Sequence, residues 1–320
     1  MSFRSVGAAS VVLLIAEMSL VRAQPPTVRL PEESAGIDTI ARTLIAAFDQ
    51  VDIVLLGEVH WQQLDSDLRI ALVRHPDFAK KVRSIVVEFA STAEQSTLDR
   101  YIRGENVPRA QLEQVWKNTT QAANGVWDSP IYAEFFAAVR DVNSKLPADA
   151  RIRVLAGDPP AGSAISRDAS AISVLKEQVL QKHGKALVIY GAGHFYRTRD
   201  YVDDIGIAKT LESEYPGRTL AVIPVGYKLE LPPGVTLRIH PDYKKFDGAV
   251  KTQARPVLVP LQRAPFRDFT AEEFAPQILN CLGAGGCRSV FQGSNLTLGQ
   301  MADAVVYVGA GVDTEAKPAR

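Results

Sequence analysis

Short runs of apolar, β-branched residues alternate along the chain with longer amphipathic segments. The runs that predict buried strands lie at 51–56, 84–89, 151–156, 186–190, 219–225 and 304–308, with weaker candidates at 236–239 and 256–259. Apolar residues at helical spacing predict helices at 36–49, 62–74, 92–103, 108–117, 129–145, 163–183 and 200–214. Because strands and helices alternate, we expect an α/β fold, a three-layer sandwich with a mostly parallel central sheet and helices on both faces.

The first residues have the pattern of an export signal. Arg4 precedes an unbroken run of apolar and small residues at 6–16, and Ala23 offers a small residue at a cleavage point. Glu17 interrupts the apolar run far short of the roughly 20 residues that a membrane span needs. We therefore expect a signal peptide at 1–23, a periplasmic or secreted location, and no integral membrane segment after cleavage.

The remaining chain divides by composition into three parts. A leader at 24–34 is rich in proline and charge, and we expect it to be an extended arm. Residues 35–310 are expected to form a single α/β domain, followed by a flexible tail at 311–320. The chain has two cysteines, Cys281 and Cys287, whose spacing in an oxidising compartment favours a local disulfide. Two ligands are too few for a cysteine-only metal site.

Composition and charge narrow the classes of partner. The 320 residues are 46% hydrophobic, which is enough for one sizeable core. The 36 Lys and Arg residues balance the 36 Asp and Glu residues, and no basic block stands out. This balance argues against a nucleic-acid or anionic-membrane partner and leaves a small-molecule ligand or substrate as the expected one.

Ionisable residues follow three of the first four predicted strands. Glu58 and His60 come directly after the first strand, Glu88 lies at the end of the second, and His194 follows the fourth in a Gly-Ala-Gly-His turn. In parallel α/β sheets, ligands bind beyond the carboxyl ends of the strands, so we expect these four side chains to share one edge. Glu58 and His60 are two residues apart and project to the same side in extended backbone.

Two imidazoles and two carboxylates support more than one chemistry. A histidine can act as a general base near neutral pH while a carboxylate fixes its tautomer or takes the second acid–base role. The same set, Glu58, His60, Glu88 and His194, could instead ligate a divalent metal through nitrogen and oxygen. Each residue also has a structural alternative, such as a core histidine or a carboxylate paired with a structural arginine.

Neighbouring residues are further candidates for the pocket. Tyr190 and Tyr196 flank His194 and could bind a ligand or metal. Trp61 and Phe195 each follow a candidate histidine and either wall an apolar pocket or pack in the core. Asp158 precedes two prolines and either contributes to the site or caps that turn.

Several of these residues lie in motifs that carry a family resemblance. VLLGEVH at 54–60, VVEFA at 86–90, LDRYIRGE at 98–105 and VIYGAGHF at 188–195 resemble the ChaN-like haem-binding family, which shares a superfamily with erythromycin esterases and Tiki proteases. The resemblance spans about residues 50–225, and ADAVVYVG at 302–309 is similar to the last core strand of that superfamily. It implies a three-layer α/β fold with a site at Glu58, His60, Glu88 and His194.

The resemblance leaves three functions open. The first is an exported hydrolase of esters or amides, with or without a metal, in which His60 activates water. The second is a haem- or metal-binding protein linked to iron uptake, without turnover, with His60, His194, Tyr190 and Tyr196 as possible axial ligands. The third is a scaffold that binds a partner.

Overall fold

We describe the protein from a computed structural model, which covers residues 28–198, 205–231, 239–274, 279–281 and 287–316. The predicted signal peptide and the start of the predicted leader lie outside these residues. In the part that the structure describes, no helix is long and apolar enough to cross a membrane.

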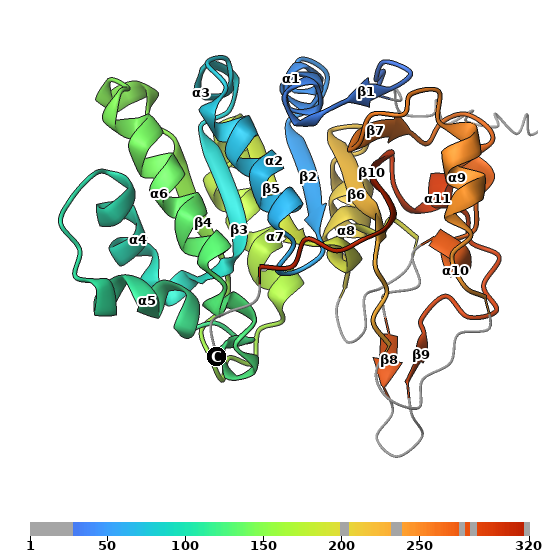
Figure 1. Cartoon of the computed structure of the whole chain (residues 1–320). Helices are drawn as coiled ribbons and strands as arrows, with labels where there is room; N and C mark the ends of the chain where they lie inside the picture. Colours follow the sequence, from blue (N-terminus) through green and yellow to red (C-terminus); the bar gives the residue numbers. More distant parts are fainter. Residues whose placement is uncertain (1–27, 199–204, 232–238, 275–278, 282–286, 317–320) are drawn as a thin grey trace, which may run out of the picture.

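The centre of the molecule is an eight-stranded sheet with the order β1-β7-β10-β6-β2-β5-β3-β4 (Figure 1). Its strands are β1 (Ser34–Ala35), β2 (Ile53–Glu58), β3 (Ser84–Ser91), β4 (Arg153–Asp158), β5 (Ala186–Gly191), β6 (Thr219–Tyr227), β7 (Val257–Pro260) and β10 (Ala304–Val312). Each neighbouring pair from β10 to β4 is parallel, whereas β7 runs antiparallel to both β10 and β1. The predicted mostly parallel sheet is therefore confirmed.

Helices cover both faces of this sheet. One face carries α1 (Ile37–Ala47), α2 (Gln63–Arg74), α3 (Phe78–Lys81), α4 (Gln95–Ile102), α5 (Arg109–Lys117) and α6 (Pro130–Ser144). The other carries α7 (Arg167–Gln178), α8 (Ile207–Glu214), α9 (Tyr243–Ala249), α10 (Ala271–Phe274) and α11 (Leu298–Met301). The three-layer sandwich expected from the alternating pattern is thus present.

Alternation along the strands builds two separate cores. In β2, Val54 and Leu56 pack with the α1–α6 layer, while Ile53 and Leu55 pack with the α7–α11 layer. All four side chains are at most 5% exposed. Successive side chains of a strand point to opposite faces, so a sheet covered on both sides needs the continuous apolar runs that the sequence shows.

The region after residue 228 was the least predictable part of the chain. The weak candidate at 256–259 is β7, and the other weak candidate, 236–239, lies almost wholly outside the described residues. A small antiparallel pair, β8 (Leu279–Cys281) and β9 (Cys287–Ser289), places Cys281 opposite Cys287 in the backbone register. The disulfide between them stays a prediction.

The C-terminal residues follow a defined path as far as Ala316. β10 runs on to Val312, and Glu315 then forms an isolated antiparallel bridge with Gln62. The backbone of Thr314 and Ala316 finds hydrogen-bond partners in the loop after β2, and the end of the tail predicted at 311–320 lies outside the described residues.

Candidate functional site

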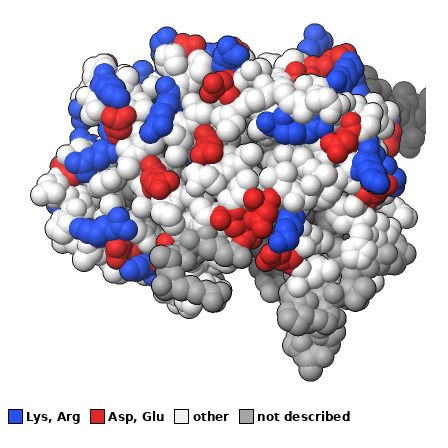
Figure 2. Space-filling view, viewed as in Figure 1, with Lys and Arg blue, Asp and Glu red and all other residues white. Residues whose placement is uncertain are grey.

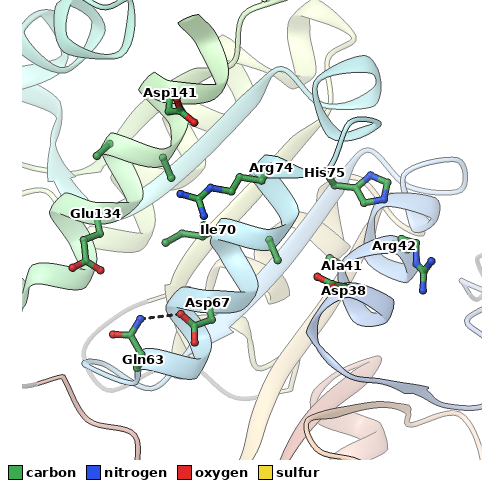
Figure 3. Close-up of a pocket in the computed structure, with 13 residues that line it drawn as sticks. Asp38, Ala41, Arg42, Gln63, Asp67, Ile70, Arg74, His75, Glu134 and Asp141 are labelled. Atoms are coloured by element: carbon green, nitrogen blue, oxygen red, sulfur yellow. Dashed lines mark hydrogen bonds between the residues drawn. The ribbon is translucent and has the colours of Figure 1, made fainter. Parts of the chain in front are cut away.

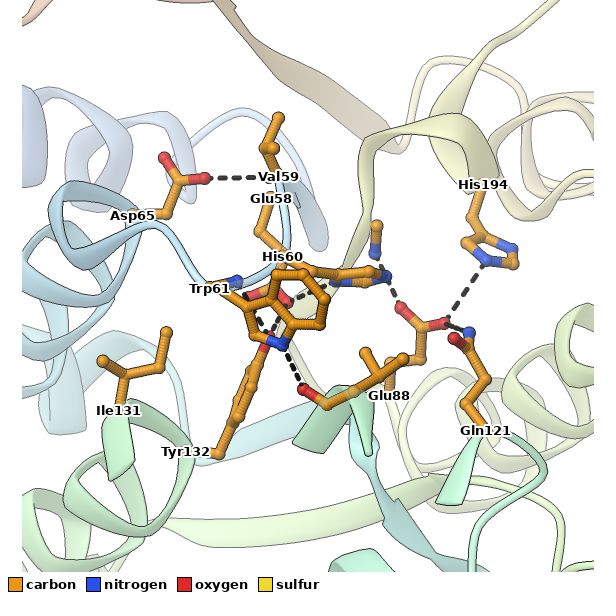
Figure 4. Close-up of polar contacts among 12 residues, drawn as sticks. Glu58, Val59, His60, Trp61, Asp65, Glu88, Gln121, Ile131, Tyr132 and His194 are labelled. Atoms are coloured by element: carbon orange, nitrogen blue, oxygen red, sulfur yellow. Dashed lines mark hydrogen bonds and ion pairs between the residues drawn. The ribbon is translucent and has the colours of Figure 1, made fainter. Parts of the chain in front are cut away.

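The order of the strands brings the candidate residues together. β5 lies between β2 and β3, so the carboxyl ends of these three strands are adjacent. Glu58 pairs in register with Gly191 across the β2–β5 interface, and Glu88 lies one residue beyond the pairing of Val87 with Ile189. Figure 4 shows Glu58 and His60 on one side of this edge and Glu88 and His194 on the other.

Glu58 is a buried carboxylate with a full set of donors. Its Oε2 accepts a hydrogen bond from Nη1 of Arg69 at 2.5 Å, and its Oε1 accepts one from the Tyr132 hydroxyl at 3.1 Å. Oε1 also lies 2.9 Å from Nδ1 of His60. Arg69 belongs to α2 and Tyr132 to α6, so the helical layer holds this carboxylate in place.

His60 is the member of the set that solvent reaches. Its side chain is 29% exposed, against 3% for Glu58, and its ring forms a T-shaped contact with Trp127 with 4.8 Å between ring centroids. Burial works to lower the pKa of His60, but the hydrogen bond to Glu58 and the charges of Glu88 and Glu58 outweigh it, so the pKa is raised.

Glu88 is fully buried and anchored on both oxygens. Oε2 accepts from the Gly191 backbone N–H at 2.7 Å, and Oε1 accepts from Gln121 at 3.0 Å and from Arg167 at 2.7 Å. Nε2 of His194 lies 3.5 Å from the same Oε1. Burial favours the neutral carboxyl, but the charge and hydrogen bond of His194 outweigh it and hold the pKa of Glu88 well below its ordinary value.

His194 is the buried cation of the set. Its Nδ1 is hydrogen-bonded to Asp168 of α7, whose other oxygen accepts from the Gly206 N–H at 2.6 Å. Burial opposes the charged imidazole, yet Glu88 and Asp168 overcome it and raise the pKa of His194 to about 9. Near neutral pH, Glu88 and His194 therefore form an ion pair with Asp168 behind it.

Gly191 separates the two halves of the site. A Cβ added at this residue would lie 3.4 Å from Nε2 of His60 and 3.5 Å from Oε2 of Glu88. These two atoms therefore flank one small space over the end of β5. A side chain here would crowd His60 rather than strain the backbone, since Gly191 has φ −50° and ψ 136°, which other residues adopt freely.

Asp158 lies at the end of β4, close enough for the charge of Glu88 to act on it. Its Oδ2 accepts hydrogen bonds from the N–H and the hydroxyl of Thr120 at 2.7 and 2.8 Å, and no described residue partners its buried Oδ1. Burial, aided by the charge of Glu88, raises the pKa of Asp158 to about 7. It is thus a buried acid at the edge of the site.

The other pocket candidates have mainly packing roles. Tyr190, Phe195 and Tyr196 are at most 2% exposed, and Tyr190 and Phe195 lie in one aromatic group with 6.3 Å between their rings. Tyr196 packs on Phe291. Trp61 lies beside the site, with its indole N–H donating to the Val126 carbonyl at 2.6 Å.

The geometry does not fit the divalent-metal set predicted from the residue types or the axial ligands predicted for haem. No group of three or more His, Cys, Asp or Glu side chains in the described ranges is arranged to hold a metal ion. The oxygens of Glu58 and Glu88 already accept from cationic and neutral donors. His194, like the two tyrosines, is almost completely buried, which leaves only His60 of the four predicted axial ligands partly exposed.

Sequence reasoning missed several residues that hold the site. Arg69, Tyr132, Gln121, Arg167 and Asp168 all contact its ionisable groups. A signal existed for Arg69, which directly follows Leu68 on the buried side of α2, where a cation requires a partner. The other four carry no such pattern.

The larger surface grooves lie elsewhere. A groove of about 950 Å³ runs between α1, α2 and α6 and is lined by residues such as Ile70, Arg74 and Glu134 (Figure 3). Figure 2 shows that Lys and Arg alternate with Asp and Glu over this face, in keeping with the neutral composition.

Comparison with known proteins supports the resemblance. A sequence model of the family described as "Haem-binding uptake, Tiki superfamily, ChaN" matches residues 44–162. No curated protein matches the chain in sequence.

Solved structures share the fold at low identity. A structural-genomics protein from Bacillus cereus has a TM-score of 0.56 and 13% identity, covering 88% of this chain and 94% of that one. A succinoglycan biosynthesis protein has a TM-score of 0.53 and 10% identity, covering 84% and 90%. An erythromycin esterase mutant in its open conformation has a TM-score of 0.51 and 10% identity, covering 90% and 99%.

The matched segment contains Glu58, His60, Glu88 and Asp158, and over this segment the chain is similar to the ChaN-like haem-binding family of the Tiki superfamily.

Proposed function

We propose that the protein is an exported hydrolase that cleaves an ester or amide bond with His60 as the general base and without a metal step. The observation that carries this proposal is that a hydrogen bond fixes the imidazole of His60 while leaving it accessible. Its Nδ1 is fixed by Glu58 at 2.9 Å, while its ring remains partly exposed at the space that it shares with Glu88. A base, its orienting carboxylate and a route for water are the minimum set for such a reaction.

The reaction follows from the tautomer that Glu58 selects. With the proton on Nδ1 donated to Glu58, the lone pair of Nε2 takes a proton from a water molecule. The oxygen of that water attacks the carbonyl carbon of the substrate. The bond from this carbon to the leaving group then breaks, and the leaving oxygen or nitrogen takes the proton back from Nε2.

Glu88 assists this transfer through its charge. Its position across Gly191 favours the imidazolium that His60 forms when it accepts the proton. The buried pair of His194 and Asp168, together with Arg167, keeps Glu88 ionised and fixed in place. We assign these three residues to positioning, because they act through Glu88.

The test measures turnover of p-nitrophenyl butyrate and of a fluorogenic peptide by the purified protein. His60→Gln should reduce kcat by at least about a hundredfold, because general base catalysis contributes about 10²–10⁴-fold. Glu88→Gln should also reduce kcat, because it removes the charge that favours the imidazolium of His60. His240→Gln, at an exposed histidine, is the matched control and should leave kcat unchanged. Full activity in a folded His60→Gln variant would rule the proposal out.

The alternative is a ChaN-type haem- or metal-binding protein linked to iron uptake, without turnover. The family description favours it, and the partial exposure of His60 leaves one imidazole for a surface-bound haem. Hemin titration distinguishes the two functions. A Soret shift that disappears in His60→Ala, together with no ester or peptide hydrolysis, would support this alternative.

Export is part of the proposal and has its own test. We propose that the chain is cleaved after Ala23, at the end of the predicted signal peptide. Fractionation of the expressing cell and mass measurement of the mature protein should give an exported species that begins at Gln24. A full-length species in the cytosol would contradict this part alone.

A further inference from the structure

Residues 313–316, which we call the strap, run antiparallel to the loop that follows His60. The Gln63 N–H donates to the Thr314 carbonyl at 2.9 Å, and the Ala316 N–H donates to the Trp61 carbonyl at 2.7 Å. The N–H and the hydroxyl of Thr314 both donate to Oε1 of Gln62, at 3.0 and 2.8 Å. The strap thus gives the loop a short pairing partner from the far end of the chain.

The loop needs such a partner because its backbone is strained. Trp61 has a φ of +70°, a left-handed conformation that a bulky residue adopts at a cost of about 1–3 kcal/mol. Strain of this kind persists only where surrounding contacts fix it. At Trp61 the indole N–H donates to Val126, the backbone N–H reaches the Tyr132 hydroxyl at 3.4 Å, and the carbonyl accepts from Ala316 of the strap.

The strap also joins the loop to the wall of the site. The Ser129 hydroxyl donates to the Ala316 carbonyl. Ser129 is two residues after Trp127, whose ring forms a T-shaped contact with that of His60. Gln62 is 3% exposed, so its bonds to Thr314 are shielded from competing water.

We propose that the strap is a positioning element of the active site: Thr314, Glu315 and Ala316 hold Trp61–Gln63 in the one backbone conformation that sets His60 between Glu58 and Glu88. The catalytic part of this inference rests on the proposed hydrolase function. The structural part, that the strap fixes the loop, stands apart from it. Glu58 orients the ring of His60, whereas the strap fixes the backbone that follows His60.

The experiment compares two truncations of the full chain. Ending the chain after Val312 removes the strap, and ending it after Ala316 keeps every contact above and is the matched control. Thr314→Val removes only the hydroxyl that donates to Gln62, and Thr314→Ser restores it. This pair of variants tests the inference even if the truncation after Val312 fails to fold. The readouts are hydrogen exchange over residues 59–64, the rate of His60 modification by diethyl pyrocarbonate, and kcat and KM with p-nitrophenyl butyrate.

We expect the truncation after Val312 to speed exchange at Gln63 by at least about tenfold, since its amide loses its acceptor. We expect kcat to fall by about tenfold to a hundredfold with KM nearly unchanged, as for a misplaced base. Thr314→Val should follow in the same direction, and Thr314→Ser should match the unaltered chain.

Two results would overturn the inference. One is exchange over 59–64 that is the same in both truncations. The other is faster exchange with unchanged kcat, which would make the strap a structural contact only. If the unaltered protein shows no hydrolysis, the proposed function fails, and the rate of His60 modification by diethyl pyrocarbonate then tests the strap alone. Faster modification in the truncation after Val312 than in the truncation after Ala316 would support positioning of His60 by the strap. Equal rates of modification would refute it.

Discussion

Arg69 is the buried cation on which the position of Glu58 depends. Its side chain is 1% exposed, bonds Glu58 at 2.5 Å and the Ile131 carbonyl at 3.2 Å, and lies over the Tyr132 ring at 5.0 Å. Arg69→Met keeps most of the side-chain length and removes the charge. We predict a strong loss of stability, because the change leaves Glu58 as a buried carboxylate without its cation.

The size of the loss follows from the burial. Removing one partner of a buried ion pair costs about 3–5 kcal/mol, whereas exposed pairs are worth about 0–1 kcal/mol. Arg109 bonds Glu113 at 2.7 Å but is 69% exposed, so Arg109→Met is the matched control. For a chain of this size, a loss of about 3–5 kcal/mol lowers Tm by about 5–10 °C.

Urea denaturation followed by far-UV circular dichroism measures the difference. Arg69→Met combined with Glu58→Gln should be more stable than Arg69→Met alone, since no charge is then left buried. The reasoning would be refuted if Arg69→Met stayed within about 1 kcal/mol of Arg109→Met, or if the added Glu58→Gln gave no recovery.

Three further predictions concern protonation and space. The folded-state pKa of His194, about 9, lies above its ordinary value of 6.5, so its stabilising contribution is complete below about pH 6.5 and is lost as pH rises through 9. The free energy of unfolding should therefore fall by up to roughly 3 kcal/mol over this window, and urea titrations of His194→Gln should show a flatter profile. Asp158 has a folded pKa of about 7 against an ordinary 3.8, so its contribution is complete below about pH 4 and is lost as pH rises through 7. Relative to the unaltered chain, the stability of Asp158→Asn should rise by about 1–3 kcal/mol as the pH is raised from about 5.5 to about 8.5. A difference in urea midpoint between the two proteins that is the same at both pH values would contradict this. Gly191→Ala should reduce kcat at least about tenfold with little change in Tm, because its Cβ would lie 3.2 Å from Cε1 of His60 in the space that the reaction requires; unchanged kinetics would show that this space is not used.

The sequence predicted the strands because their chemistry is local. Val51–Leu56 and Ala186–Tyr190 are continuous apolar runs, which indicate strands buried on both faces whatever their neighbours are. The rule that ligands gather beyond the carboxyl ends of parallel strands then placed Glu58, Glu88 and His194 at one edge. The order of the strands could not be obtained in this way, since which strand lies next to which depends on long-range packing.

The supporting residues were less predictable for the same reason. Asp168 comes 26 residues before His194 and Tyr132 comes 74 after Glu58, so no spacing rule connects them. The ending at 311–316 is short and polar, which in isolation indicates a tail. Its path is set by acceptors on a loop some 250 residues earlier, which composition does not record.

The central position of β5 has a consequence for the matched segment. Residues 44–162 contain β2, β3 and β4 but not β5, the strand that hydrogen-bonds to both β2 and β3. In a nascent or cleaved chain that stops there, β2 and β3 have no strand to bridge them, and neither His194 nor Arg167 is present to neutralise Glu88. The site is therefore completed only when the second half of the protein inserts β5 between β2 and β3.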